Sequence, residues 1–237
     1  MPRRAFVPIQ KAPSLVEQVA LQLSKMFTEG GGLVGDKLMS ERNLAAQLGV
    51  SRNVLREAIK CLETQGLLEI RQGHGTQVVH KLHKPITAAL NLLVPEEQER
   101  MQQLFEVRSI IEPESARIAA LKASKKQVLQ IKAAQKKLQE ADTVEAAVAA
   151  DTEFHRSIAN ASGNQILLLV IESLSVLLAE GQRIGFQTID PTQPIPRHQE
   201  VLDAIERRDG DAAAQAMATH IEEARLIFFR SAKRTRK

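Results

Sequence analysis

The sequence predicts a mainly α-helical protein in two parts, a small N-terminal domain of three helices and a β-hairpin, followed by an all-helical bundle. Ala and Leu recur at helical spacing through most of the 237 residues, and the absence of Trp and Tyr means that the core must be aliphatic. A pattern typical of β-strands occurs only in the stretch LLEIRQGHGTQVVH. No strand pattern returns after Lys84-Pro85, so the remainder is predicted to be helical.

The N-terminal elements are bounded by residues that begin and end helices. Residues 14–30 are predicted to form an amphipathic helix that Ser14 caps and a run of glycines ends. A second helix begins at Ser40 and ends at Gly49, and a third covers Ser51 to about Gln65. The segments LLEIRQ and TQVVH flank Gly-His-Gly and predict a hairpin. Three helices followed by a hairpin are the pattern of a winged helix-turn-helix domain, which we assign to residues 1–80.

The rest of the chain predicts a linker over residues 81–94 and a helical domain over residues 95–237. Pro113 lies inside the first long helix and should kink it, because proline removes a backbone donor and crowds the preceding turn. The segment 181–196, which contains Gly185 and three prolines, should be the longest irregular stretch. The expected helices cover residues 86–93, 96–122, 125–141, 144–161, 165–180, 197–208 and 211–231.

Composition and charge limit the classes of function. The formal net charge of +4 permits nucleic-acid binding without proving it. The single cysteine, Cys61, excludes an intramolecular disulfide and fits a reducing cytoplasm, and its helical context predicts a buried side chain. The most apolar segment, ILLLVIESLSVLLA, is interrupted by Glu172 and is too short to span a membrane. We therefore expect a cytoplasmic protein without a membrane partner.

The third helix separates apolar and polar residues onto two sides. By itself the polar side could be a solvated surface, but a short helix and a Gly-containing turn precede it, as in a helix-turn-helix. The N-terminal end of such a helix enters the major groove, where Arg suits guanine and Asn suits adenine. Ser51 or the helix N-terminus can hold a phosphate, and Gly73-His74-Gly75 would form the tip of a wing. The polar side comprises Arg52, Asn53, Arg56 and Lys60.

The stretch SERNLAAQLGVSRNVLREAIKCLETQGLLEIRQGHGT resembles the DNA-binding domain of the GntR superfamily of bacterial transcription regulators, whose pattern it follows nearly throughout. Two positions depart from that pattern, since Met39 stands where Pro is usual and Gln77 where Phe is common. Neither departure affects the arginines. The resemblance implies that operator DNA is contacted by Arg42, Arg52, Arg56, His74 and Gly75.

A second group of candidate residues lies in the helical half. Asp151 and His155 are four residues apart and share one helix face. His198 and His220 are each eleven residues from Asp209, so an antiparallel pairing of their helices would bring both imidazoles to the same height. Three His and one Asp would bind a divalent transition metal, zinc foremost, or Ni, Mn or Co. An open coordination position could accept an exogenous carboxylate.

The helical half resembles the FCD ligand-binding domain of the FadR-type branch, in the segments EVRSIIEPESARIAA, DTEFHRSIANASGN and RHQEVLDAIERRDGDAAAQAMATHI. Arg108 matches an arginine that would pair with a carboxylate effector. Asn164 is a second effector-binding candidate, although Ser-Gly-Asn is also typical of a turn between helices. Glu112 is the weakest candidate, since it precedes Pro113 and could serve only the kink. The resemblance implies that the metal ligands are Asp151, His155, His198 and His220.

These features favour a metabolite-responsive, sequence-specific transcription regulator that binds a palindromic operator as a homodimer. As a repressor, it would be released by a small organic acid bound at the metal centre. The first alternative is a metallohydrolase with a DNA-binding appendage, against which no general base accompanies the site. The second is a regulator whose metal is purely structural. Lactate-like hydroxy acids, dicarboxylates, sugar acids and pyruvate all fit an arginine beside a metal.

Overall fold

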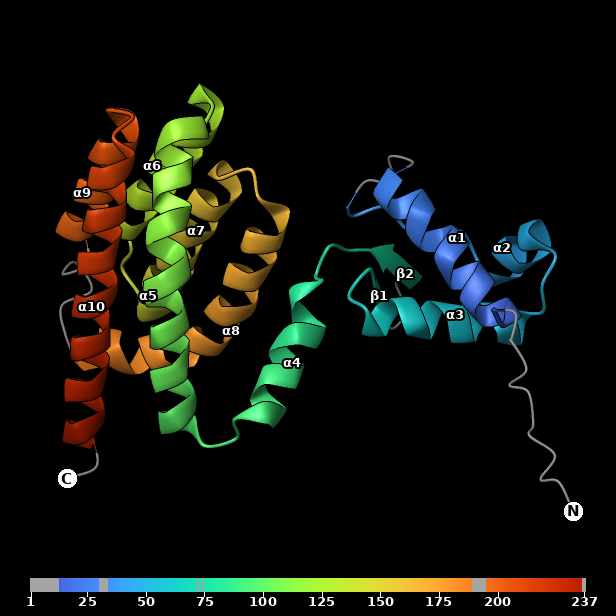
Figure 1. Cartoon of the computed structure of the whole chain (residues 1–237). Helices are drawn as coiled ribbons and strands as arrows, with labels where there is room; N and C mark the ends of the chain where they lie inside the picture. Colours follow the sequence, from blue (N-terminus) through green and yellow to red (C-terminus); the bar gives the residue numbers. More distant parts are fainter. Residues whose placement is uncertain (1–12, 30–33, 72, 74, 189–194, 236–237) are drawn as a thin grey trace, which may run out of the picture. The chain divides into compact units, whose positions relative to one another are not determined.

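The computed structural model describes residues 13–29, 34–71, 73, 75–188 and 195–235, and the chain divides into two compact units, residues 1–85 and 86–237. The predicted fold class is confirmed, with helices and a two-stranded wing in the first unit and a helical bundle in the second (Figure 1). The first unit comprises α1 (Leu15–Glu29), α2 (Glu41–Leu48), α3 (Arg52–Thr64), β1 (Leu68–Arg71) and β2 (Gly75–Val78).

Local side-chain chemistry sets the turn between α2 and α3. The Ser40 hydroxyl accepts a hydrogen bond from the backbone N–H of Asn43 at the start of α2. Gly49 ends α2 with a φ of 66°, a left-handed conformation that glycine adopts without steric cost. Two residues later, the Ser51 hydroxyl accepts from the N–H of Val54 and caps α3. The two helices are therefore joined by a tight turn whose geometry the sequence encodes locally.

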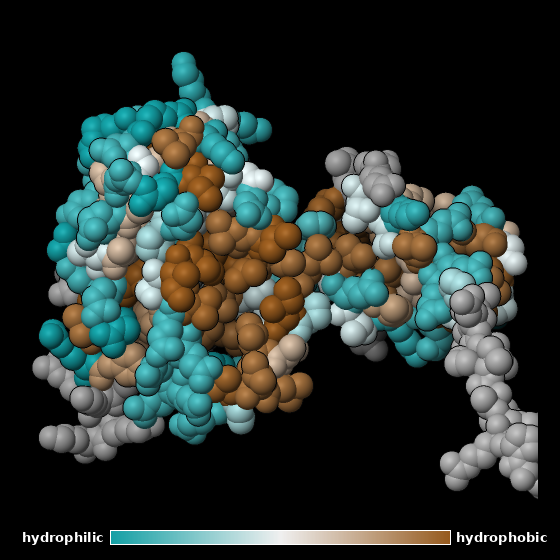
Figure 2. Space-filling model, viewed as in Figure 1, coloured by the Kyte–Doolittle hydropathy of each residue, from teal (hydrophilic) through white to brown (hydrophobic). Residues whose placement is uncertain are grey.

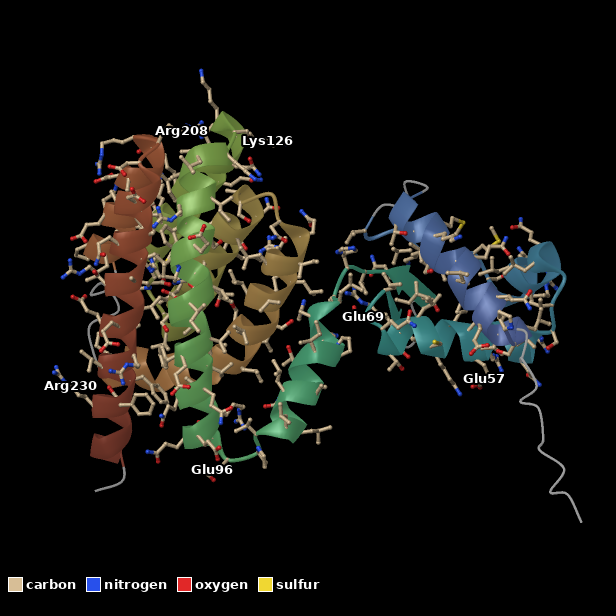
Figure 3. All side chains as sticks on the ribbon, viewed as in Figure 1. Glu57, Glu69, Glu96, Lys126, Arg208 and Arg230 are labelled. Atoms are coloured by element: carbon tan, nitrogen blue, oxygen red, sulfur yellow. The ribbon has the colours of Figure 1, made fainter. Side chains whose placement is uncertain are left out.

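One side of α3 is buried in the core of the first unit and the other is exposed. The buried side chains are Leu55, Ala58, Ile59 and Leu62, at helical spacing. Glu57, on the exposed side, points away from α1 (Figure 3). Cys61 is exposed, so the prediction of a buried cysteine was wrong. Its position is one residue, or about 100° around the helix, from the buried Leu62.

The wing is a two-stranded antiparallel hairpin in which Leu68 pairs with Val78 and Arg71 pairs with Gly75. The side-chain amide of Gln77 donates a hydrogen bond of 2.6 Å to the backbone oxygen of Gly35. Gln77, which departs from the family pattern, thus joins the wing to the segment before α2.

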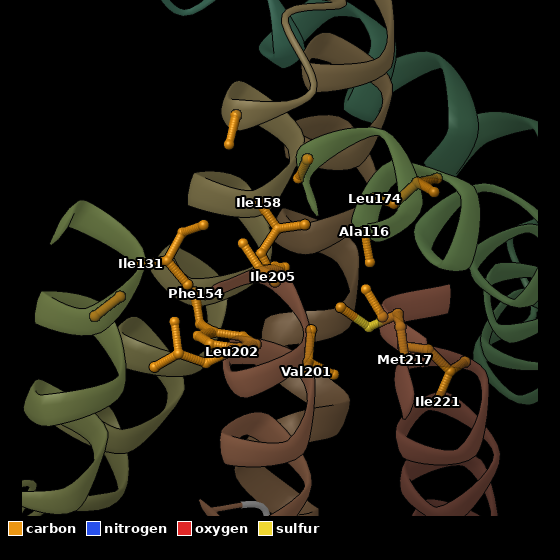
Figure 4. Close-up of a cluster of buried hydrophobic side chains, with 14 of the residues drawn as sticks. Ala116, Ile131, Phe154, Ile158, Leu174, Val201, Leu202, Ile205, Met217 and Ile221 are labelled. Carbon is orange, nitrogen blue, oxygen red and sulfur yellow. The ribbon is translucent and has the colours of Figure 1, made fainter. Parts of the chain in front are cut away.

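The second unit is a bundle whose described residues include a large aliphatic core cluster with a few phenylalanines. Figure 4 shows part of this cluster, including Phe154, Ile158, Val201, Ile205 and Met217, all at most 1% exposed. The helices are α4 (His83–Leu93), α5 (Glu97–Lys122), α6 (Lys125–Gln139), α7 (Val144–Ala161), α8 (Gln165–Thr188), α9 (Ile195–Glu206) and α10 (Gly210–Thr235).

Two predictions concern breaks in the helices of this unit, and the kink at Pro113 stays a prediction. The helix α5 includes Pro113 and is continuous from Glu97 to Lys122. The prediction of an irregular segment over residues 181–196 was wrong at both ends, because α8 continues to Thr188 and α9 begins at Ile195, while residues 189–194 lie outside the described residues. Glycine inside a helix costs only about 1 kcal/mol, so Gly185 weakens α8 without ending it. Within the described residues no helix, α8 included, is long and apolar enough to cross a membrane.

Among the described glycines of the first unit, Gly66 is predicted to be the one that least tolerates replacement. Its φ is 80°, and an added Cβ would lie 2.2 Å from the backbone oxygen of Lys81. Gly66→Ala should therefore lower the free energy of unfolding by about 2 kcal/mol or more, measured by chemical denaturation.

The matched control is Gly49→Ala. Gly49 has a similar φ of 66°, but nothing lies within 4 Å of its added Cβ. This variant should lose only the cost of the left-handed backbone, about 1 kcal/mol. Equal losses in the two variants would show that the contact with Lys81 has no energetic consequence.

Candidate metal centre and nucleic-acid interface

Four buried side chains from three helices meet inside the bundle. Asp151 and His155 lie one turn apart on α7, while His198 comes from α9 and His220 from α10. Their exposed fractions are between 0 and 5%. The short turn between α9 and α10 places the two later histidines opposite each other, as their equal distances from Asp209 predict. The sequence candidates for metal binding are thus brought together.

The ligand-type atoms of this group converge on one point. The Nε2 atom of His220 lies 3.2 Å from that of His198 and 3.1 Å from that of His155. Asp151 Oδ1 lies 3.4 Å from His198 Nε2. One ligand atom from each residue falls within 4.8 Å of the others. Two nitrogens each about 2.1 Å from a common zinc ion would lie roughly 3 to 3.4 Å apart, so the spacing fits a metal.

The protonation state of the histidines also suits metal binding. Burial lowers the pKa of His198 and of His220 well below the usual value, and the nearby His155 and Arg108 lower it further. Both rings are therefore neutral near pH 7. Neutral imidazole is the form that ligates metals.

Arg108 and Glu112 form a buried ion pair on α5 beside this cluster. The guanidinium Nε of Arg108 donates to Glu112 Oε1, and Glu112 Oε2 lies 2.5 Å from His155 Nδ1. Burial alone would raise the pKa of Glu112, but the adjacent Arg108 and His155 hold it well below its usual range. Glu112 therefore carries a negative charge in the interior.

Sequence reasoning underestimated Glu112, which it connected only with the kink at Pro113. The signal that could have found it is its spacing of four from Arg108, which places both side chains on one face of α5. Its contact with His155 had no signal in the sequence, because the two residues lie on different helices. Glu112 thus belongs to the candidate site, because it contacts Nδ1 of His155, the ring nitrogen other than the Nε2 atom that faces the other histidines.

Arg108 also reaches the centre of the cluster. Its Nη2 atom lies 3.5 Å from His155 Nε2, the ring nitrogen that faces the other histidines. The guanidinium is 5.6 Å from the centroid of the Phe105 ring. A cation beside the converging ligand atoms is well placed to meet an anion bound there.

The contacts of Asn164 are those of a turn between two helices, the alternative to effector binding that its Ser-Gly-Asn context offered. It is exposed, and its Oδ1 accepts hydrogen bonds of 3.1 Å from the backbone N–H groups of Ile166 and Leu167. These contacts cap the first turn of α8.

The DNA-binding candidates of the first unit lie on its surface. Arg52, Asn53 and Arg56 are exposed on α3, and Arg42 is exposed on α2. The Arg56 Nε atom pairs with Glu41 Oε2 at 2.6 Å, which orients the guanidinium across α2 and α3. Gly75 is exposed with a φ of 85° at the wing. Ser51 caps α3, and His74 lies outside the described residues.

Comparison with known proteins identifies both units. Residues 15–78 match the family described as bacterial regulatory proteins, gntR family, and residues 103–223 match the FCD domain. The chain belongs to the GntR family, in the branch that carries an FCD domain. The Exu regulon transcriptional regulator of Escherichia coli K12 is 30% identical over 222 residues, covering 91% of this chain and 84% of that regulator.

Two further relatives agree with this assignment. An E. coli K12 protein, assigned by its name to the L-lactate dehydrogenase operon as a regulatory protein, is 33% identical over 218 residues, 87% of this chain and 83% of that protein. The solved structure of a Streptococcus agalactiae GntR protein is 28% identical with a TM-score of 0.69, covering 89% of this chain and 99% of that one.

This GntR protein is therefore a DNA-binding transcription regulator, as its sequence pattern predicts. The relatives that it matches are regulators and not enzymes, which removes the support for a metallohydrolase.

The lowered pKa values predict how stability depends on pH in the metal-free protein. The unfolded state takes up protons on His198 and His220 below about pH 6.5, whereas the folded state resists them. Stability should therefore be full above pH 6.5 and fall as the pH is lowered through 6 and 5. Melting temperatures of chelator-treated protein across this range measure the effect.

Replacing both His198 and His220 with Asn should flatten this pH dependence, because Asn does not titrate. The control is His80→Asn, since His80 is exposed, and it should retain the wild-type slope. A wild-type slope in the double variant would contradict the assignment of the pH dependence to these two rings.

Proposed function

We propose that this GntR regulator is a homodimeric repressor that is released from a palindromic operator when a small carboxylate binds a metal in the FCD domain. The observation that carries the proposal is the convergence of four buried ligand atoms beside a buried arginine. The metal ligands would be Asp151, His155, His198 and His220.

The donor set suits a divalent transition metal, zinc foremost, with Ni, Mn and Co as further candidates. When bound, such an ion supplies a Lewis-acidic position for an effector carboxylate. The chain supplies the rest of the site. Glu112 orients the His155 ring through Nδ1, and Arg108 presents a cation to the effector.

The effector acts through its preference for one of two states of the protein. If the carboxylate favours a form that binds the operator weakly, DNA and effector must disfavour each other by the same free energy, typically about 1–3 kcal/mol. One relative is named for the L-lactate dehydrogenase operon, which supports a small organic acid as the effector class.

Two arguments support a dimer. One recognition helix contacts too few bases for useful specificity, so regulators of this type pair to read two half-sites. The FCD unit also has exposed apolar side chains, including Val107 and Ile110 on α5 and Ile166 on α8, at 39%, 73% and 75% exposure. Figure 2 shows apolar residues gathered on one face of this unit. Such a face is suited to contact a second copy.

A structural metal remains a second version of the proposal, favoured by the burial of the ligands on three separate helices. Chelation distinguishes the versions. A structural metal predicts a lower melting temperature with unchanged effector affinity, whereas an effector-binding metal predicts the loss of both.

His198→Ala should lose bound metal and the response to carboxylates while retaining operator affinity, because α3 and the wing belong to the other unit. Elemental analysis of protein purified without a His tag or chelator measures the metal, and operator titration with and without effector measures the response. Normal release from the operator by carboxylate in this variant would refute the metal-dependent mechanism.

Arg52→Ala should weaken operator binding by about 1–3 kcal/mol and relax the preference at one base position. A panel of operators with single base changes, titrated at fixed salt concentration, measures both effects. The control is Arg225→Ala on α10, whose guanidinium pairs with Glu222, and it should leave binding unchanged. A uniform loss across the panel would identify Arg52 as a phosphate contact.

A further inference from the structure

We propose that the FCD site selects a small monocarboxylate and rejects dicarboxylates, because Glu112 already neutralises the buried arginine that faces the metal ligands. This inference rests on the proposed metal-dependent function and specifies the charge that the effector carries. It excludes the dicarboxylates from the acids that, by the sequence alone, all fit an arginine beside a metal.

Buried charge in the described part of the FCD unit is concentrated at the candidate site. Histidines aside, the charged side chains that are buried in the described part of the FCD unit are Arg108, Glu112 and Asp151, with exposed fractions of 3 to 4%. All three lie at the candidate site. Arg108 pairs with Glu112, Glu112 contacts His155, and Asp151 Oδ1 is 3.4 Å from His198 Nε2. They must therefore be counted as one electrostatic unit.

The charges of these three side chains do not cancel. One guanidinium and two carboxylates give a net charge of −1, and imidazoles that ligate a metal are neutral. Asp151 is ionised when it ligates a metal, and a divalent ion changes the net charge to +1. Uncompensated charge in a protein interior is strongly unfavourable. A single carboxylate brings the site to neutrality, whereas a dicarboxylate returns it to −1.

The guanidinium of Arg108 has two edges that can each donate a pair of hydrogen bonds. Glu112 faces the edge of the guanidinium formed by Nε and Nη2, with Oε1 near Nε and Oε2 3.5 Å from Nη2. One effector carboxylate could accept two parallel hydrogen bonds from the edge formed by Nη1 and Nη2, whose Nη2 atom lies 3.5 Å from His155 Nε2. No second buried cation lies among the described side chains to receive another carboxylate.

The net charge of the site and the geometry of Arg108 both favour a monocarboxylate over a dicarboxylate, and a matched pair of ligands tests this. Lactate and malate are both 2-hydroxy acids, and malate differs by a carboxylate in place of a hydrogen on the methyl group. Lactamide has the size of lactate without its charge. The effect of charge can thus be separated from the effect of the hydroxy-acid group.

The experiment is calorimetric titration of the zinc-loaded full-length protein with lactate, malate and lactamide. We expect lactate to bind at least about tenfold more tightly than either of the others, which corresponds to 1.4 kcal/mol. Malate binding as tightly as lactate would overturn the inference. This series needs no variant, so it remains decisive if a substitution prevents folding.

Glu112→Gln tests the stated cause. It keeps the shape of the side chain and removes one negative charge, so the metal-loaded site becomes +2 and should accept a dianion. The ratio of malate to lactate affinity should rise by about tenfold or more, and zinc content should be measured beside it. A ratio unchanged from the wild type would overturn the role of Glu112.

The matched control is Glu106→Gln, the same substitution at an exposed position on the same helix. It should leave the ratio unchanged. Because the readout is a ratio, a general loss of metal affinity affects both ligands alike. Zinc-loaded protein that binds neither acid would overturn the effector part of the proposed function, and the inference with it. Protein that takes up no zinc would overturn the metal proposal itself.

Discussion

The FCD unit is organised around the cost of burying polar groups. Three histidines, two carboxylates and one guanidinium occupy its interior, where unpaired charge is far more costly than in water. Each must therefore meet a partner, and those partners come from α5, α7, α9 and α10. Because the contacts require particular side chains to be within about 3 Å, they constrain the register and rotation of four helices at once.

The aliphatic core and this polar centre form one continuous structure. Phe154 belongs to the hydrophobic core, and its ring stacks on His198 with 4.1 Å between centroids and 9° between planes. A core residue thus fixes the orientation of a candidate ligand, as outer contacts do in metal sites. Glu112 does the same for His155 through the Nδ1 atom of its ring. The candidate ligands are held by packing and by charge together.

The DNA-binding unit depends on local rules instead. In a domain of this kind the recognition helix needs one apolar side for the core and one polar side for DNA, and here capping residues and a glycine set the tight turn before α3. A base-reading surface must stay exposed, whereas an effector site gains strength from the exclusion of water. The two units therefore place their candidate functional residues in opposite environments.

The sequence by itself determined the elements and several distances. Helix periodicity and caps predicted α1 to α3 and the wing, because these signals depend on neighbours within a few residues. The spacing of Asp151 and His155, and the equal offsets of His198 and His220 from Asp209, predicted their approach, because helix geometry is regular.

Only the tertiary structure decided the rest. The contact of Glu112 with His155 depends on how α5 is rotated against α7, and no local pattern encodes that angle. The exposure of Cys61 and the extension of α8 to Thr188 likewise depend on packing, which outweighs weak propensities such as those of glycine. The charge balance of the site is therefore a property of the fold, since it arises where residues distant in sequence share one buried volume.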